Sequence, residues 1–580
     1  MKFSSYIWEK QAAMKWSAIF PILAYLPGYR WIDFRGDLMA GLTVGVMLVP
    51  QGMAYGMLAG LPPIYGLYAG LAPVLLYVFF GTSRYLSVGP VALVSLLVLN
   101  GISRMAAPGT AYFVQLAVAT ALLAGIIQIL LGLFRLGFLV NFLSHPVMSG
   151  FTSAAAFVIG LSQIKFLFGI ELPQTNRIQD IVAAAAAHIE NLHPLTFGIG
   201  VGGILLILLL RKIKKTFPGA LVTVVLGVLL VGTLRLDLAG VAIVGEVPQG
   251  LPGFGLPRVT FEDARKLLPL ALTICLISFI ESLAIARKLQ DKHKDHKVLP
   301  NQELLALGLS KVGGAFFHAT PTTGSFTRSA INESTGARTG ISSVLAALVV
   351  ALTLLMLTPF FFYLPKALLA SVIVVAVIGL VDYREAIHLW KTDRRDFYAL
   401  IVTFAATLTL GIQSGVIAGV VLSLALMLYS NSRPHVAILG RLPNSPNYRN
   451  ITRFEQARLQ SDLLILRFDA QLYFGNAGFF QDTLTGLVEE QKGRLKAVVL
   501  DASSISDLDS SGARALGQVL DNLRSHEIQL YLAGVIGPVR DALQRQGLIE
   551  KTGGTGFLFF SVHEAVEAYN RIKNEKKPTK

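Results

Sequence analysis

The chain has 580 residues, of which 53% are hydrophobic and only 15% charged, and its mean hydropathy is +0.60. These values exclude an ordinary soluble globular protein and place the chain among multi-span membrane proteins. The net charge of +15 does not indicate a nucleic-acid partner, because the basic residues cluster in short loops between apolar runs. We therefore expect the lipid bilayer, and no nucleic acid, as a partner.

Residues 1–35 are predicted to be a retained cytoplasmic segment, because no cleavable signal with a small-residue cleavage site stands out. A spanning helix needs about 20 mostly apolar residues, which places a transmembrane domain over 36–431. The twelve predicted spans are 38–58, 64–80, 111–134, 140–168, 195–210, 217–234, 267–286, 303–318, 340–358, 365–381, 396–411 and 413–430. Two shorter apolar pieces, 88–101 and 325–334, bring the count to fourteen, which divides into two halves of seven.

The basic residues predict the orientation of these spans. Five groups follow even-numbered spans: Arg135, 211–215, the run from Arg287, Arg338 and 391–395. Short basic loops remain cytoplasmic, so both termini are predicted to be cytoplasmic. The longer loops on the opposite side, 169–194 and 236–256, carry few basic residues, in agreement. We expect an integral protein of a bacterial inner (plasma) membrane.

The most informative feature of the first half is a break, Gly81 to Pro90 (GTSRYLSVGP), between two long apolar runs. Arg84 is the only charged residue from Leu38 to Ser103. Irregular backbone at membrane depth is tolerated only where it is buried in protein or lines a cavity. In transporters, such interruptions in corresponding positions of two halves indicate the substrate site.

The second half contains a counterpart, 318–340 (HATPTTGSFTRSAINESTGARTG), which is polar and rich in Gly, Thr and Ser. If short helices begin near Pro90 and Thr327, their N-termini can approach each other from opposite sides of the midplane. Each N-terminus offers unpaired N–H groups and about +0.5 of a charge. Hydroxyls of Ser325 and Thr327 and the charge of Arg328 would add to this. The pair predicts an anion site; the alternative is two ordinary extramembrane loops.

Glu281, in ICLISFIESLAIARK, is the one acid deep within an apolar span. A charge at the bilayer centre costs about 2.5–3.5 kcal/mol on insertion scales, so such a residue is a functional hypothesis by default. Burial favours the neutral acid and a nearby cation favours the carboxylate. We hypothesise that Glu281 takes up a proton with each transported anion. The alternative is a permanent structural ion pair with Arg328 or with a cytoplasmic-side cation such as Arg287.

The composition changes after Tyr429. The stretch 432–452, rich in Arg, Pro and Asn, is predicted to be a linker, and 574–580 a solvated basic tail. Between them, 453–573 alternates strand-like with helical runs, which predicts a small cytoplasmic α/β domain. Its strands are expected at 462–469, 496–503 and 528–535, and its helices at 478–492, 510–525, 538–546 and 562–573.

Within this domain, DLDSSGARAL makes Asp509 a candidate N-cap and places Ser510 in the first turn of a helix. A phosphate at a helix N-terminus is electrostatically favoured. Phosphorylation of Ser510 is therefore a hypothesis, although serine-rich caps are also common without any kinase.

Several motifs together carry a family resemblance. LVPQGMAYGMLAGLPPIYGLYAGLAPVLLYVFFGTSRYLSVGPVALVSL, followed by NQELLALGL, GSFTRS and LPKALLASVIVVAV, resembles the sulfate permease (SulP) family of anion transporters over nearly the whole chain. The resemblance implies an α-helical polytopic protein with fourteen membrane segments in two inverted seven-helix repeats. It also implies core and gate domains, a homodimer and a C-terminal cytoplasmic STAS domain. Asp-Ser-Ser-Gly likewise resembles the phosphorylation loop of STAS-type anti-sigma-factor antagonists.

Carried over position by position, the resemblance implies an anion site made of Gln51, Tyr55, Val91, Ala92, Ser325, Thr327 and Arg328. Without the resemblance, Tyr55 would equally be a packing aromatic. Family members that couple to sodium carry a shorter carboxylate at the position of Glu281 and a hydroxyl residue four positions on. This chain has Ile285 there, a departure that disfavours sodium.

We therefore expect secondary active transport of a small anion, sulfate-like, bicarbonate or dicarboxylate, by proton symport and alternating access. We expect no enzyme activity, cofactor or metal. One alternative is an anion channel or exchanger. Another is a non-transporting membrane sensor, which would signal anion occupancy to a cytoplasmic regulator through the STAS domain.

Overall fold

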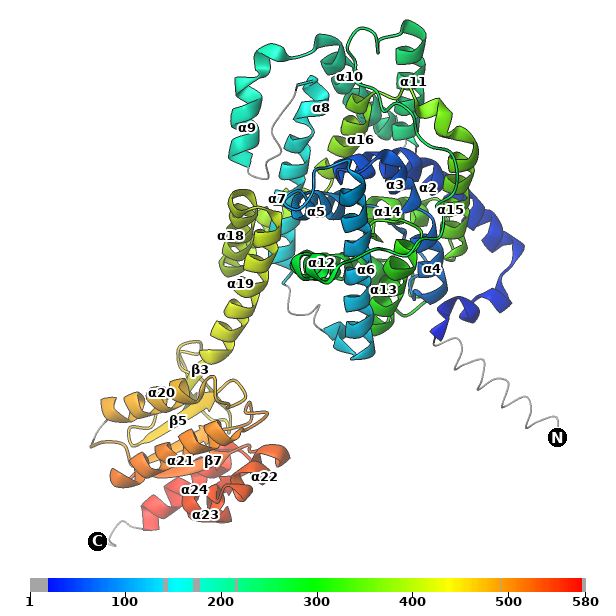
Figure 1. Ribbon diagram of the computed structural model, residues 1–580. Coiled ribbons are helices and arrows are strands. Elements are labelled where there is room, and N and C mark those ends of the chain that lie inside the picture. Colours follow the sequence, from blue (N-terminus) through cyan, green and yellow to red (C-terminus); the bar gives the residue numbers. More distant parts are fainter. Residues whose placement is uncertain (1–18, 139–143, 171–177, 214–216, 492, 576–580) are drawn as a thin grey trace, which may run out of the picture. The chain divides into compact units, whose positions relative to one another are not determined.

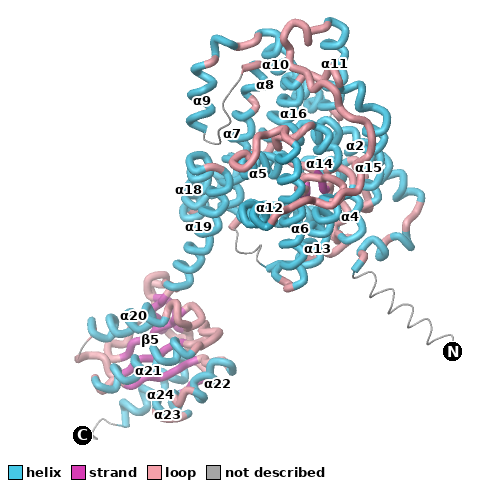
Figure 2. The backbone as a smooth tube through the Cα atoms, viewed as in Figure 1, coloured by secondary structure: helices cyan, strands magenta, loops and turns pink. Residues whose placement is uncertain are grey.

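The computed structural model describes residues 19–138, 144–170, 178–213, 217–491 and 493–575. It divides into two compact units, Met1–Ser423 and Leu424–Lys580. The first unit is helical apart from two very short strands, and the second is a sheet covered by helices (Figures 1 and 2). Eight helices within the described residues are long and apolar enough to cross a membrane. The predicted polytopic helical fold is confirmed, and the number of fourteen segments stays a prediction.

The helices of the first half follow the predicted spans, with three main differences. The span predicted at 64–80 is interrupted between Tyr68 and Ala72, the span predicted at 140–168 is divided at Gln163, and the helix over 178–187 was not predicted. Residues 139–143, at the start of one predicted span, lie outside the described part. The helices are α2 (Trp31–Leu58), α3 (Pro63–Tyr68), α4 (Ala72–Phe80), α5 (Ala92–Ile102), α6 (Ala111–Leu133), α7 (His145–Ser162), α8 (Ile164–Phe168), α9 (Ile178–Ala187), α10 (Pro194–Ile213) and α11 (Gly219–Leu234).

The second half begins with α12, which extends well beyond its predicted span at both ends. The hydroxyl of Thr260 caps its N-terminus by accepting a hydrogen bond from the N–H of Asp263 at 3.1 Å, so the helix starts before the apolar run does. The helices are α12 (Phe261–His293), α13 (Pro300–Ala315), α14 (Phe326–Ser334), α15 (Ile341–Leu352), α16 (Lys366–Ile378), α17 (Tyr383–Thr392), α18 (Arg394–Leu410) and α19 (Ile412–Ser432).

These helices pack as two groups, each drawn from both halves of the sequence. In the first group, which we call the core, α2 to α6 pack with α12 to α15. In the second, the gate, α7 to α11 pack with α16 to α18. Glycines let the helices of the core approach closely. A Cβ on Gly41 would lie 2.6 Å from the carbonyl oxygen of Ser342, and a Cβ on Gly125 would lie 2.8 Å from that of Gly308.

One such approach, between α2 and α3, gives a testable prediction. A Cβ on Gly66 would overlap the carbonyl oxygen of Gly52, which is backbone and cannot swing away. Gly66→Ala is therefore expected to lower the stability of the folded protein by about 1–3 kcal/mol. Thermal unfolding of the purified protein in detergent measures this change. The control is Gly198→Ala in α10, where a Cβ meets nothing within 4 Å; equal unfolding temperatures for the two variants would contradict the prediction.

The second unit contains a six-stranded sheet in the order β4-β3-β5-β6-β7-β8, in which β5 to β8 are parallel. Its strands are β3 (Val436–Arg441), β4 (Tyr448–Asn450), β5 (Leu463–Phe468), β6 (Ala497–Asp501), β7 (Gln529–Ala533) and β8 (Leu558–Phe559). One face packs on α20 (Ala477–Glu490), α21 (Ser510–Ser525) and α22 (Gly537–Arg545), and the other on α24 (Val562–Glu575). The predicted α/β domain is confirmed. Burial on both faces explains why its central strands are almost continuously apolar.

The structure corrects the predicted linker over 432–452. Residues 436–441 form β3, which pairs antiparallel with β5, and residues 448–450 form β4 at the sheet edge. The composition was misleading because Pro443 and Asn444 belong to the turn between two short strands, where Asn444 adopts a positive φ of 54°.

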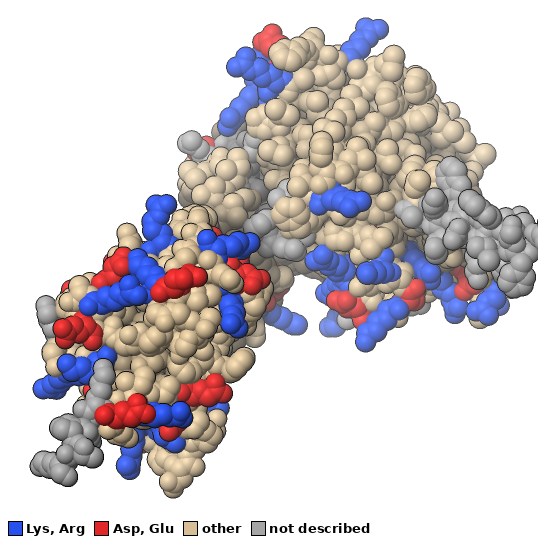
Figure 3. Space-filling view, turned by 90° about the horizontal axis from the view of Figure 1, so that it is seen from below, with Lys and Arg blue, Asp and Glu red and all other residues tan. Residues whose placement is uncertain are grey.

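The two units also differ in their surfaces. In Figure 3 the C-terminal unit carries interspersed acidic and basic side chains, whereas most of the visible surface of the helical unit is uncharged. An uncharged surface of this size suits contact with lipid, and a mixed charged surface suits water. The chain is an integral membrane protein with one water-exposed domain.

Candidate anion site

The two sequence breaks meet in the core. Each contains a two-residue strand, β1 (Val88–Gly89) and β2 (Thr323–Gly324), and these strands pair antiparallel. The N–H of Ser325 donates to the carbonyl of Ser87 at 2.9 Å, and the N–H of Ser87 donates to the hydroxyl of Ser329 at 2.9 Å. Because α5 and α14 start directly after these paired strands, the pairing brings their N-termini close to each other.

Arg328, in the first turn of α14, is the cation of this site. Its side chain is fully buried. One guanidinium nitrogen, Nη1, lies 2.9 Å from the carbonyl oxygen of Pro90 and 3.5 Å from Oε1 of Gln51. The other two nitrogens, Nε and Nη2, have no hydrogen-bond partner among the described residues. Unpaired buried donors cost free energy, so this arrangement favours an anionic acceptor beside Arg328.

Gly89 lies against the guanidinium of Arg328. A Cβ at this position would lie 3.1 Å from Nη2 of Arg328. A side chain here would crowd one of the two nitrogens that lack a partner, and glycine avoids this contact.

The structure brings most of the predicted site residues together. Gln51 and Tyr55 lie one turn apart on α2 and are buried. Val91 is the N-cap of α5, and Ala92 is its first residue. Ser325 is the N-cap of α14, and its hydroxyl accepts from the N–H of Arg328 at 3.4 Å. Thr327 lies in the same turn but is half-buried, and its hydroxyl has no partner among the described residues.

Glu281 lies on α12, which packs against β2. Its Oε2 is buried and has no hydrogen-bond partner within the described part of the chain. It interacts electrostatically with Arg328, yet no cation of the described residues lies within 4 Å of its carboxylate. In this structure Glu281 therefore forms no ion pair within 4 Å with Arg328 or Arg287, and the two readings of Glu281 stay predictions.

Two serines tie the turn that carries Glu281 to the cradle formed by β1, β2 and the starts of α5 and α14. The hydroxyl of Ser282 accepts from the N–H of Gly324 at 2.8 Å and lies 3.0 Å from the hydroxyl of Thr323. The hydroxyl of Thr323 also donates to the carbonyl of Ser278 at 3.0 Å. Sequence reasoning missed these residues, although serines three residues before and one residue after Glu281 in an apolar span were a usable signal.

A buried lysine was also missed. Lys311 on α13 is 1% exposed, and its Nζ donates to Oε1 of Gln128 at 2.9 Å. The amide nitrogen of Gln128 donates in turn to the carbonyl of Cys275 at 3.0 Å and to the hydroxyl of Ser278 at 2.9 Å. This network braces α12 one turn before Glu281. The sequence signal for this buried charge was the presence of a lysine within the span predicted at 303–318.

Buried carboxylates hold the segments that flank the cradle. Glu303 accepts from the N–H of Thr82 at 2.7 Å and from the hydroxyl of Tyr77 at 2.8 Å, which fixes the start of the first break. Asp37 accepts from the N–H groups of Arg338 and Thr339 at 2.7 and 3.0 Å, which fixes the segment after α14. Glu303 of the second half thus holds the break of the first half, and Asp37 of the first half holds the break of the second half.

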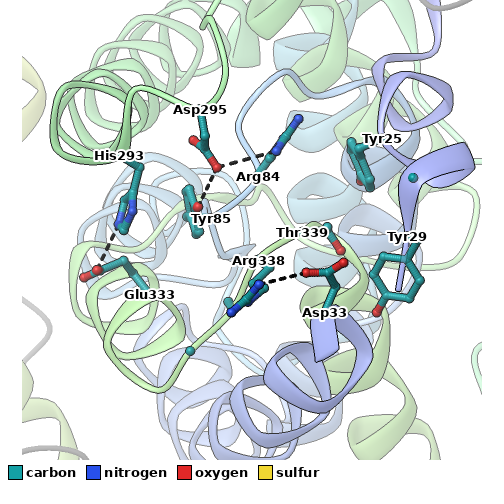
Figure 4. Close-up of a pocket in the computed structure, with 13 residues that line it drawn as sticks. Tyr25, Tyr29, Asp33, Arg84, Tyr85, His293, Asp295, Glu333, Arg338 and Thr339 are labelled. Carbon is teal, nitrogen blue, oxygen red and sulfur yellow. Dashed lines mark hydrogen bonds and ion pairs between the residues drawn. The ribbon is translucent and has the colours of Figure 1, made fainter. Parts of the chain in front are cut away.

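A pocket of about 470 Å³ is lined by residues that include Tyr25, Arg84, Asp295 and Arg338 (Figure 4). Its charged groups pair with each other: Arg84 with Asp295 at 3.5 Å, and Arg338 with Asp33 at 3.0 Å. Burial would raise the pKa of Asp295, but hydrogen bonds from His296 and Tyr85 and the charge of Arg84 outweigh it and hold the pKa below its usual value. Because these charges are already compensated, this pocket is a weaker candidate for an anion site than the cradle at Arg328, where two guanidinium nitrogens lack a partner among the described residues.

Comparison with known families and proteins agrees with this geometry. Residues 34–403 match the model of the sulfate permease family, and residues 456–565 match that of the STAS domain. The chain is 40% identical to sulfate transporter 4.1, chloroplastic, of Arabidopsis thaliana, over 95% of this chain and 82% of that protein. It is 34% identical to high affinity sulfate transporter 2 of Stylosanthes hamata, over 95% of this chain and 86% of that one.

Solved structures show the same fold. The structure of SLC26A9 superposes with a TM-score of 0.88 at 25% identity, covering 98% of this chain and 96% of that chain. The transmembrane domain of the cyanobacterial bicarbonate transporter BicA gives a TM-score of 0.59 at 21% identity, covering 68% of this chain and 98% of that one. The second likeness concerns the fold alone.

Proposed function

Because this chain belongs to the sulfate permease family, we propose that it is a secondary active transporter of a small inorganic or carboxylic anion. Sulfate is the first candidate, since the relatives reported above include plant sulfate transporters; bicarbonate and dicarboxylates follow. The observation that carries the proposal is the buried guanidinium of Arg328, with two nitrogens lacking a partner, beside two converging helix N-termini. The anion-binding residues are Gln51, Tyr55, Val91, Ala92, Ser325, Thr327 and Arg328.

The transport is proposed to be proton symport by alternating access, with the core moving against the gate. Glu281 is the proposed coupling group, because its carboxyl lies within electrostatic reach of Arg328 without a fixed ion-pair partner. An anion beside Arg328 would oppose the negative carboxylate, so anion binding favours proton uptake by Glu281. Both termini are proposed to be cytoplasmic and the protein to act as a homodimer.

Uptake of radiolabelled sulfate, bicarbonate and dicarboxylates into proteoliposomes, with and without an imposed pH gradient, tests this proposal. A transporter accumulates its substrate and responds to the gradient. A channel gives a flux that follows the driving force without strict coupling. A sensor binds the anion without net flux, and that result would overturn the proposal.

The STAS domain is proposed to receive a cytoplasmic regulatory signal at Ser510. This residue is exposed at the first position of α21, directly after the N-cap Asp509. The carboxylate of Asp509 accepts from the N–H of Gly512 at 2.7 Å and from that of Phe474 at 2.9 Å, so the cap is rigidly held while the serine hydroxyl stays accessible.

Ser510→Asp, which imitates a phosphate at this helix N-terminus, is expected to change the uptake rate by about two- to fivefold, the effect of one charge at a helix end. Ser510→Ala should transport like unmodified protein. Uptake by reconstituted protein measures both rates. Ser525→Asp, at the exposed C-terminus of the same helix, is the control; equal rates for all three variants would contradict a regulatory role of Ser510.

A further inference from the structure

Four buried polar side chains connect α13 to the anion cradle through the interior of the core. They are Lys311 on α13, Gln128 on α6, Ser278 on α12 and Thr323 on β2, and we call them the core relay. Each is at most 1% exposed. A polar side chain away from water costs free energy unless it is hydrogen-bonded, and these four residues are bonded each to the next.

Lys311 sets the orientation of the Gln128 amide. Its Nζ donates to Oε1 of Gln128 at 2.9 Å. An ammonium group has only donors, so it pairs with the oxygen of the amide and not with the nitrogen. The amide nitrogen is thereby turned toward α12, where it donates to the hydroxyl of Ser278 at 2.9 Å and to the carbonyl of Cys275 at 3.0 Å.

Ser278 joins this amide to the cradle. Its carbonyl accepts from the hydroxyl of Thr323 at 3.0 Å. One turn further along α12, the hydroxyl of Ser282 lies 3.0 Å from the same Thr323 hydroxyl and accepts from the N–H of Gly324 at 2.8 Å. Gly324 ends β2, and α14, which carries Arg328, starts two residues later. A shift of this part of α12 therefore moves β2 and the start of α14.

We propose that Lys311 is a positioning residue of the anion site, which through the core relay keeps α12 seated on β2 and the cradle in its anion-binding shape; this inference rests on the proposed function. Lys311 acts on the cradle through hydrogen bonds, while Arg328 supplies the charge that faces the anion. Without the lysine, Oε1 of Gln128 is buried and unpaired, which costs free energy and favours a different orientation of the amide. Ser278 then loses its donor, and the contact between α12 and Thr323 loosens.

The first test is a double-mutant cycle across the relay. Lys311→Met keeps the length of the side chain without its donors, and Thr323→Val removes the hydroxyl at the other end. Each is expected to weaken sulfate binding by about two- to thirtyfold. If both changes interrupt one relay, the double variant binds sulfate no more weakly than the weaker-binding single variant, whereas independent effects multiply. Binding of radiolabelled sulfate to the full-length protein in detergent gives the dissociation constants.

The second test separates positioning from stability. Lys311→Met combined with Gln128→Met removes both partners of one hydrogen bond and leaves no unpaired amide, so its unfolding temperature should stay close to that of the wild type. It should still bind sulfate as weakly as Lys311→Met. Thr120→Val is the control, because this buried hydroxyl on α6 donates to the carbonyl of Leu116 on the same helix at 2.8 Å. We expect wild-type sulfate binding for the control.

The outcomes separate this inference from the function on which it rests. If wild-type protein binds neither sulfate, bicarbonate nor a dicarboxylate, the proposed function fails and the inference fails with it. If wild-type protein binds sulfate and Lys311→Met binds it equally well, or its effect multiplies with that of Thr323→Val, only the role of Lys311 is overturned. An equal effect of Thr120→Val would also overturn it, because any lost polar group of the core would then act alike.

Discussion

Arg328→Gln is expected to reduce anion uptake by about 30-fold to several thousand-fold. The guanidinium is fully buried and holds the carbonyl of Pro90 and the amide of Gln51 on one side while two nitrogens stay unpaired. Truncating one partner of a buried charge pair costs about 2–5 kcal/mol, and each 1.4 kcal/mol is about tenfold. A neutral amide retains neither the charge nor the reach to both neighbours. Initial uptake of radiolabelled sulfate into proteoliposomes measures the effect.

Arg338→Gln is the matched control, because Arg338 follows the same short helix but has an exposed side chain and pairs with Asp33 at 3.0 Å. An exposed ion pair contributes at most about 1 kcal/mol, so uptake should change by less than about fivefold. Uptake by Arg328→Gln at the rate of the wild type would show that the anion does not bind in the cradle.

Glu281→Gln is expected to abolish accumulation of the anion against its gradient when a pH gradient is the driving force. The amide imitates the protonated acid, so the variant cannot exchange a proton during the cycle. No hydrogen bond or ion pair of Glu281 within the described residues is lost, and the variant should therefore fold. Exchange of internal for external labelled anion, which needs no net proton movement, should persist at a substantial rate.

Accumulation and exchange are measured in the same proteoliposome preparation, so that loss of one with retention of the other identifies a coupling defect. Glu262→Gln is the control, since Glu262 lies on the same helix at its exposed start and pairs with Lys266. Unchanged pH-driven accumulation by Glu281→Gln would remove the carboxyl from the coupling mechanism.

Much of the membrane domain was predictable because lipid imposes a strong length and polarity rule on each span. Almost every predicted span coincides with a helix, and the helices at Ala92 and Phe326 begin within two residues of the predicted positions. The linker was mispredicted because β3 and β4 form edge strands, whose pairing with β5 depends on residues outside the stretch itself. A turn between two strands and a linker have similar local compositions, so composition alone does not distinguish them.

Some of the site residues were predictable from the sequence and others were not. Sequence analysis identified Arg328, Ser325 and Glu281 because polar groups within apolar runs are rare and require a structural or functional explanation. Lys311 was not singled out, although it lies within a predicted span. Whether such a charge is buried depends on the helices around it, which for Lys311 include α6.

The membrane spans, the C-terminal α/β domain and the two polar breaks were predictable from the sequence. Those properties depend on the hydropathy and turn chemistry of neighbouring residues. The pairing of β1 with β2 and, within the described residues, the unpaired nitrogens of Arg328 and the unpaired Oε2 of Glu281 became apparent only in the folded structure. These contacts join residues more than 200 positions apart or depend on their surroundings, and local patterns carry no information about such distances.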